Sequence, residues 1–142
     1  MSTINPYINF NGSCEEAFEF YKAVFGGDFM GPKMTWDGVD MGEPVPEAAK
    51  GKIMHMALPI GEGSVLMGSD CVEGFGPPVE FGNNMSIAIS PPSKEEADRL
   101  FNGLSEGGKV SMPMADAFWG GYFGSFTDKF GVSWLINYDK NR

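Results

Sequence analysis

The feature that most constrains the fold of this chain is an internal repeat. Segments 13–27 (SCEEAFEFYKAVFGG) and 93–108 (SKEEADRLFNGLSEGG) both begin Ser-x-Glu-Glu-Ala and end in a glycine pair. In each segment the serine suits a helix N-cap, and the glutamate three residues on, Glu16 or Glu96, suits the reciprocal partner of a capping box. The glycines suit the left-handed geometry of a helix end. The repeat therefore predicts two equivalent helices.

The apolar positions of the two segments also correspond. They recur at the i, i+3, i+4 and i+7 spacing of a helix with one buried face. The matching positions are Ala17, Phe20, Tyr21 and Val24 in the first segment and Ala97, Leu100, Phe101 and Leu104 in the second. Because such a face must be covered, we expect each helix to pack on a sheet.

Strand-like segments surround both helices in the same order. One strand precedes each helix, at 4–10 and 84–90, and three follow it: 28–36, 52–60 and 64–70, then 109–115, 118–128 and 132–138. The prediction is an α+β fold of two βαβββ modules, 1–70 and 83–142, within a single domain, 1–142. The Pro- and Gly-rich stretch 71–82 is predicted to be the linker, and 37–51 a long loop.

The composition limits the classes of function. At 142 residues the chain has the length of one domain, and it has no apolar stretch of the roughly 18 residues that a membrane span needs. A net charge of −9 opposes binding to nucleic acid or to an anionic membrane, because phosphate would be repelled. The N-terminal residues lack the basic and apolar stretches of a signal peptide, so we expect a cytoplasmic protein with reduced thiols at Cys14 and Cys71.

Alternation along the predicted strands separates an apolar face from a mixed face. The apolar faces should pack under the helices, and they carry Met54, Met56, Leu58, Met85, Ile87, Ile89, Val132, Trp134 and Ile136. The mixed faces should line a concave ligand site made of Asn5, Tyr7, Asn9, His55, Met67, Ser69, Ser86, Ser133 and Asn137. An apolar base with scattered polar groups suits a small molecule. The alternative is that aromatic side chains of the protein fill this space, with Trp119, Tyr122 and Phe123 as candidates.

Three stretches resemble the PhnB-like branch of the vicinal oxygen chelate superfamily, in the order that the family has them: 4–27 (INPYINFNGSCEEAFEFYKAVFGG), 52–70 (KIMHMALPIGEGSVLMGSD) and 118–137 (FWGGYFGSFTDKFGVSWLIN). That superfamily includes glyoxalase I, extradiol dioxygenases, fosfomycin-resistance enzymes and bleomycin-binding proteins. The resemblance implies that the modules form a cup-shaped mixed sheet with the helices on its convex side, in a homodimer. Members often carry the label of a demethylubiquinone methyltransferase. Nothing in this chain supports methyl transfer. The chain lacks an alternating βα pattern, and its glycine-rich stretch GEGS (61–64) lies in a predicted hairpin and not at a strand-to-helix phosphate turn.

The resemblance also identifies where a metal would be bound. Metal-dependent members place one His, Gln or Glu ligand on the first strand and on the last-hairpin strand of each module. Those four positions fall near Asn5, Met67, Ser86 and Leu135. None supplies the imidazole or carboxylate that divalent metals need in such sites, so we predict no metal there and no cofactor.

His55 is the only histidine and the only candidate for catalysis by a general base. Across its predicted hairpin, Ser69 should be its neighbour, whereas Asp70 should point to the other face. We expect a hydrogen bond to a ligand or to neighbours; a structural role and a metal site remain alternatives. Asp128 is expected to cap its own Asp-x-x-Gly turn.

Two classes of function remain open. The first is a metal-free small-molecule binder that encloses its ligand between subunits, as the resemblance to bleomycin-binding proteins implies. The second is an enzyme of the same superfamily: a lyase, isomerase or dioxygenase with a metal at unusual ligands, or one with His55 as general base. The unusual ligands would come from Asp37, Asp40 or Glu43 in the long loop. We favour the binder.

Overall fold

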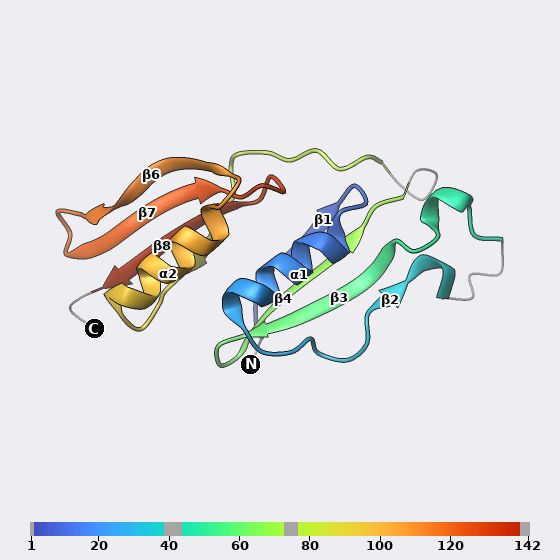
Figure 1. The fold of residues 1–142 in the computed structure, drawn as a ribbon, viewed down its shortest axis with the longest axis horizontal. Helices are drawn as coiled ribbons and strands as arrows, with labels where there is room; N and C mark the ends of the chain where they lie inside the picture. The colour runs from blue at the N-terminus through green and yellow to red at the C-terminus, as the bar shows by residue number, and fades with distance from the viewer. Residues whose placement is uncertain (1, 39–43, 73–76, 140–142) are drawn as a thin grey trace. The chain divides into compact units, whose positions relative to one another are not determined.

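The computed structural model describes residues 2–38, 44–72 and 77–139, and the chain divides into two compact units, Met1–Glu80 and Phe81–Arg142. Figure 1 shows the elements of each unit. The first unit contains β1 (Tyr7–Phe10), α1 (Cys14–Phe25), β2 (Met34–Thr35), β3 (Ile53–Ile60) and β4 (Ser64–Asp70). The second contains β5 (Ile87–Ile89), α2 (Lys94–Ser105), β6 (Lys109–Asp116), β7 (Gly121–Thr127) and β8 (Ser133–Asp139).

The two units share one topology. Each has a four-stranded mixed sheet, in the order β1-β4-β3-β2 and β5-β8-β7-β6. The first strand of each unit runs parallel to the last, and the other pairs are antiparallel. The predicted α+β fold of two βαβββ modules is confirmed. The stretch 61–64 lies at the β3–β4 hairpin, where Ile60 pairs with Ser64.

In the first unit, α1 covers one face of the sheet. A side chain at Gly68 would come within 2.7 Å of the Phe18 ring, so Gly68 faces α1. Its strand partners Ile8 and Met56 share that face. Alternation then places Tyr7, Asn9, His55, Met67 and Ser69 on the opposite face.

In the second unit, α2 covers the sheet in the same way. A side chain at Gly124 would come within 2.8 Å of the Phe101 ring, so Gly124 and its partner Ile136 face α2. The buried side chains on this side include Leu100, Leu104, Phe126 and Trp134. Phe123 and its partner Asn137 therefore lie on the face opposite α2.

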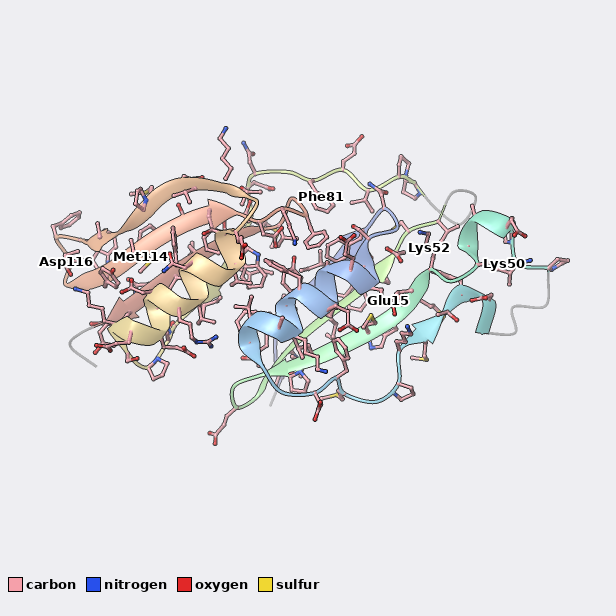
Figure 2. The ribbon with its side chains drawn as sticks, in the orientation of Figure 1. Glu15, Lys50, Lys52, Phe81, Met114 and Asp116 are labelled. Carbon is pink, nitrogen blue, oxygen red and sulfur yellow. The ribbon has the colours of Figure 1, made fainter. Side chains whose placement is uncertain are left out.

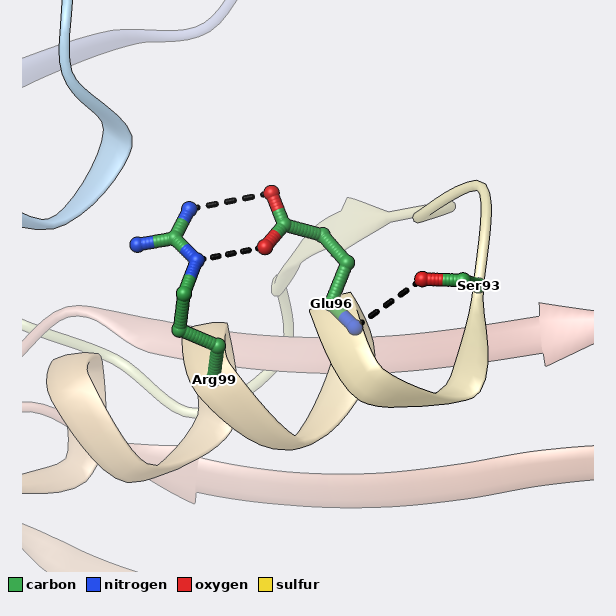
Figure 3. Close-up of polar contacts among 3 residues, drawn as sticks. All are labelled: Ser93, Glu96 and Arg99. Atoms are coloured by element: carbon green, nitrogen blue, oxygen red, sulfur yellow. Dashed lines mark hydrogen bonds and ion pairs between the residues drawn. The ribbon is translucent and has the colours of Figure 1, made fainter.

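The helix starts differ from the predicted capping boxes. Ser93 Oγ accepts a hydrogen bond from the Glu96 N–H at 3.1 Å, but the Glu96 carboxylate binds Arg99 instead of reaching back (Figure 3). Ser13 makes no side-chain cap hydrogen bond. The predicted hydrogen bond from the Ser93 N–H back to the Glu96 carboxylate is therefore wrong. The predicted side-chain cap by Ser13 is also wrong.

Three strand predictions also need correction. The predicted strand 28–36 is reduced to two residues, because Gly31 has a φ of +71° and Pro32 follows it. The predicted strand 118–128 begins only at Gly121, after a turn. Met85, expected under the helix, is 80% exposed, because β5 begins two residues later.

Candidate functional site

The face opposite α1 brings Tyr7 and His55 together. The Tyr7 hydroxyl lies 3.2 Å from His55 Nδ1, and the two rings stack with centroids 5.7 Å apart. The strand register explains the contact: Tyr7 pairs with Met67 on β4, and His55 lies across β4 on β3. Tyr7 is 46% exposed, so the pair presents both an aromatic ring and polar atoms to solvent.

Two asparagines complete this face, and both are engaged by β4. Ser69 Oγ donates to Asn9 Oδ1 at 2.9 Å, and Ser69 is buried. The Val65 N–H donates to Asn5 Oδ1 at 3.0 Å, which extends the ladder past the start of β1. The predicted residues of the first module are thus gathered on one face, with Asn5 at its edge.

The face opposite α2 holds Ser133 and Asn137, whereas Ser86 precedes β5 and is exposed. Trp119 packs edge-on against Phe123 beside Asn137, with ring centroids 5.8 Å apart. Tyr122, a predicted filler of this side, lies on the other: its hydroxyl donates to Asp98 Oδ1 of α2 at 2.6 Å. That expectation for Tyr122 is wrong, because its neighbours Gly121 and Phe123 occupy the opposite face.

Of the four positions at which the resemblance leads us to look for metal ligands, Met67 and Leu135 lie in β4 and β8, whereas Asn5 and Ser86 precede β1 and β5. Met67 pairs with Tyr7, and Leu135 pairs with Ala88; neither pair carries an imidazole or a carboxylate. Within residues 2–38, 44–72 and 77–139, no three His, Cys, Asp or Glu side chains gather to hold a metal ion.

Of the three loop carboxylates considered as alternative metal ligands, only Asp37 lies in the described residues; Asp40 and Glu43 fall outside them. Asp37 Oδ1 accepts from the Gly51 N–H at 3.2 Å. A hydrogen bond from the Thr35 hydroxyl, with the one from Gly51, lowers the pKa of Asp37. Asp37 therefore has a local role at the start of the loop.

Asp70 and Asp128 are buried carboxylates that organise backbone. Asp70 accepts from the N–H groups of Gly12, Cys14 and Ile53, each at 2.9 Å, on the α1 side of the sheet. Asp128 accepts from two N–H groups of its turn, those of Phe130 and Val132, and from the Trp134 indole. Asp70 thus points away from His55.

The two cysteines are free thiols. Burial raises the pKa of the Cys14 thiol well above its ordinary value, and the charges of Asp70 and Glu15 add to this effect. Since the thiolate is the nucleophile and the metal ligand, Cys14 is suited to neither role. Lys52, labelled in Figure 2, donates from Nζ to the Gly12 carbonyl at 3.3 Å beside the same helix start.

Sequence reasoning placed Tyr7 and His55 on one face but missed their hydrogen bond. It also missed the contact of Trp119 with Gly121, although the glycine pair 120–121 after Phe118 and Trp119 signalled a tight turn that could bring the indole back onto the sheet.

The chain is similar throughout its length to known proteins. Residues 2–137 match the family model described as 3-demethylubiquinone-9 3-methyltransferase. The crystal structure of protein PA1353 from Pseudomonas aeruginosa is 41% identical, with 98% of each chain covered and a TM-score of 0.84. A protein from Bacillus cereus, titled a putative 3-demethylubiquinone-9 3-methyltransferase and PhnB protein, is 25% identical, covers 96% of this chain and 99% of its own, and has a TM-score of 0.73.

A more distant structure shares the fold. The glyoxalase/bleomycin resistance protein from Albidiferax ferrireducens is 15% identical, with 96% of this chain and 98% of that chain covered and a TM-score of 0.59. No helix among the described residues is long and apolar enough to cross a membrane. From the family-model match and the solved structures together, the chain belongs to the PhnB-like family described as 3-demethylubiquinone-9 3-methyltransferase, and it has the fold of the glyoxalase/bleomycin resistance proteins.

Proposed function

We propose that this protein binds small organic molecules without a metal, on the sheet face opposite α1 and, separately, on the sheet face opposite α2. The observation that supports this most strongly is the Tyr7–His55 pair, where a stacked phenol and imidazole are partly exposed. Met67 supplies an adaptable apolar neighbour on the same face. Apolar area with a few fixed polar groups is the common composition of ligand sites.

The proposal of a metal-free site follows from the chemistry of these side chains. The described residues of the two faces offer mainly amides and hydroxyls, with a single imidazole and the carboxylate of Asp139, whereas a divalent metal needs several imidazoles or carboxylates. Added Zn²⁺, Ni²⁺ or Mn²⁺ should leave the melting temperature nearly unchanged, because a ligand of the folded state raises it. A stoichiometric metal with a large rise in melting temperature would favour a metal-dependent lyase, isomerase or dioxygenase.

We also propose that the protein is a homodimer. Among the described strands, β1, β2, β5 and β6 each pair on one side only, and such open edges are commonly covered by a partner. Sedimentation should give twice the chain mass at micromolar concentration. A monomer under those conditions would contradict it.

One observation supports a second candidate, an enzyme with His55 as general base. If Nδ1–H donates to the Tyr7 oxygen, Nε2 carries the free electron pair and can accept a proton from a substrate. A compound that the wild-type protein converts but His55→Ala only binds would support this candidate. Methyl transfer, named in the family description, has no comparable support in the described residues.

Native mass spectrometry of the protein as isolated tests the binding proposal. We expect an organic compound that leaves on unfolding, with lower occupancy in Tyr7→Phe and His55→Ala. One neutral hydrogen bond contributes about 0.5–1.5 kcal/mol, so each change should weaken binding several-fold. Tyr122→Phe, the same chemical change on the α2 side of the second sheet, is the control. A protein without bound compound, which no small organic molecule in a broad library stabilises against heat, would contradict the proposal.

A further inference from the structure

A buried hydrogen-bond acceptor of the second unit has no partner. Within the described part of the chain, Asn137 Oδ1 is buried and accepts no hydrogen bond. Buried polar atoms are nearly always paired, because desolvating an unpaired one costs stability. Asn137 lies on the face opposite α2, so its unused acceptor belongs to the side proposed to bind ligand.

Gly121 brings a hydrogen-bond donor beside this acceptor. A side chain at Gly121 would come within 2.4 Å of Asn137 Oδ1 and 2.5 Å of Trp119 Nε1. Both polar atoms therefore approach the bare backbone of Gly121, and only glycine permits it. An acceptor, Asn137 Oδ1, and a donor, the Trp119 indole N–H, are therefore both present beside Gly121.

Exposed aromatic rings border this pair. Phe118 is 98% exposed and Trp119 is 54% exposed, with their ring centroids 5.2 Å apart. The turn that presents them is closed by hydrogen bonds from the Ala117 N–H to the Gly121 carbonyl and from the Gly120 N–H to the Ala117 carbonyl. Half-exposed rings offer flat apolar area on which another ring can stack.

The charge on this face restricts the ligand further. Asp139 pairs with Gly121 and follows Asn137 at the alternation of the same face. A carboxylate so close disfavours an anion and favours a neutral ring that presents a donor.

We propose that Asn137, Gly121, Trp119 and Phe123 form a subsite, the Asn137 subsite, for a flat cyclic amide. The ring N–H donates to Asn137 Oδ1, the ring carbonyl accepts from Trp119 Nε1, and the ring stacks on the aromatic side chains. Binding requires a small shift of the half-exposed indole, which belongs to the turn and not to the sheet. This inference rests on the proposed function and assigns a ligand class to it.

A matched pair of compounds tests the subsite in the wild-type protein. 2-Quinolone carries the N–H and the carbonyl, and N-methyl-2-quinolone keeps the ring and carbonyl but lacks the donor. We expect calorimetry to show that 2-quinolone binds at least about tenfold more tightly than its methylated form. Equal binding of the two, or no binding of 2-quinolone up to its solubility limit, would overturn the inference.

Variants locate the effect. Asn137→Leu removes the acceptor and should abolish the difference between the two compounds, whereas Asn102→Leu, the same change at an exposed position of α2, should keep it. Trp119→Phe keeps a ring on the exposed turn but loses the N–H, and should weaken both compounds. If Asn137→Leu fails to fold, the Trp119→Phe result and the wild-type comparison still decide. The assignment is contradicted by a preference for 2-quinolone that persists undiminished in folded Asn137→Leu, or by wild-type affinity for both compounds in folded Trp119→Phe.

The two proposals fail in different ways. A compound carried by the isolated protein that is lost in Tyr7→Phe but fully retained in Asn137→Leu would overturn the Asn137 subsite and leave the proposed function standing. An isolated protein without bound compound that binds neither quinolone, and that no molecule of the broad library stabilises against heat, would contradict both.

Discussion

Asp70 shows how one side chain organises several segments of the first module. It is 2% exposed, yet its carboxylate accepts three backbone hydrogen bonds from the start of α1, the turn before it and the start of β3. Its negative charge also lies at the positive end of the helix dipole. A position that first suggests a partner for His55 is therefore structural.

Asp70→Asn should be strongly destabilising, because an amide has one acceptor oxygen where the carboxylate uses two. Hydrogen bonds to a charged group contribute about 1.5–3 kcal/mol, and we expect a loss of that order in the free energy of unfolding by urea. Glu62→Gln, at an exposed position of the β3–β4 turn, is the control and should change it by less than about 0.5 kcal/mol. Equal stability of Asp70→Asn and the wild type would show that these hydrogen bonds contribute little.

Ionisation of the Tyr122 hydroxyl should lower the stability of the folded protein in alkaline solution. The hydrogen bond to Asp98, with burial and the charges of Asp98 and Asp116, raises the pKa of Tyr122 to about 12. This pKa lies above the ordinary value near 10. The neutral Tyr122 side chain therefore makes its full contribution to the free energy of unfolding below about pH 10, and this contribution is lost between about pH 10 and 12.

The measurement compares wild type with Tyr122→Phe by denaturant unfolding at several pH values. The advantage of the wild type should be constant up to about pH 9.5 and shrink as the pH rises above 10. An advantage that stays constant to pH 11.5 would contradict the assigned shift.

The two helices show that one sequence pattern can be stabilised by two different contacts. In α2 the Ser93 hydroxyl caps the helix, as the repeat predicts. In α1 the Asp70 carboxylate, from the end of β4, takes the Cys14 N–H and Ser13 makes no cap. Nothing within segment 13–27 reveals this substitution, because the carboxylate comes from a distant strand.

Serine-to-alanine changes at these equivalent positions should therefore differ. Ser93→Ala should lower the free energy of unfolding by about 1 kcal/mol, the usual contribution of an N-cap hydroxyl, whereas Ser13→Ala should cost less than about 0.5 kcal/mol. The two variants serve as controls for each other in one urea titration series. Equal losses would mean that Ser13 caps α1 after all.

Long alternating segments were predictable, and interrupted ones were not. The predicted strands at 52–60 and 64–70 match β3 and β4 closely, because hydrophobic alternation and a glycine turn agree there. The strand predicted at 28–36 is shortened because Gly31, with its positive φ, and Pro32 interrupt the extended backbone, although Met30 and Trp36 on either side still donate backbone hydrogen bonds to Ala57 and Lys52. The matching order of strand-like segments around the two helices carried the prediction there, without regard to these breaks.

The repeat was sufficient to predict the βαβββ topology twice, since each amphipathic helix needs a sheet to cover it. Alternation was sufficient to place Tyr7 and His55 on one face. Their mutual hydrogen bond and the unpartnered oxygen of Asn137 depend on strand register and on the bare backbone of Gly121, which only the folded chain defines.

A crystal structure of the protein as isolated, refined first without any ligand, would show whether a small molecule is bound on these sheet faces. We expect difference density for an organic molecule against the face opposite α1, within hydrogen-bond distance of Tyr7 or His55, or against the matching face of the second module. Density for a metal ion bound by Asn5, Met67, Ser86 or Leu135, or for a ligand on the helix-covered side of either sheet, would contradict ligand binding without a metal on these faces.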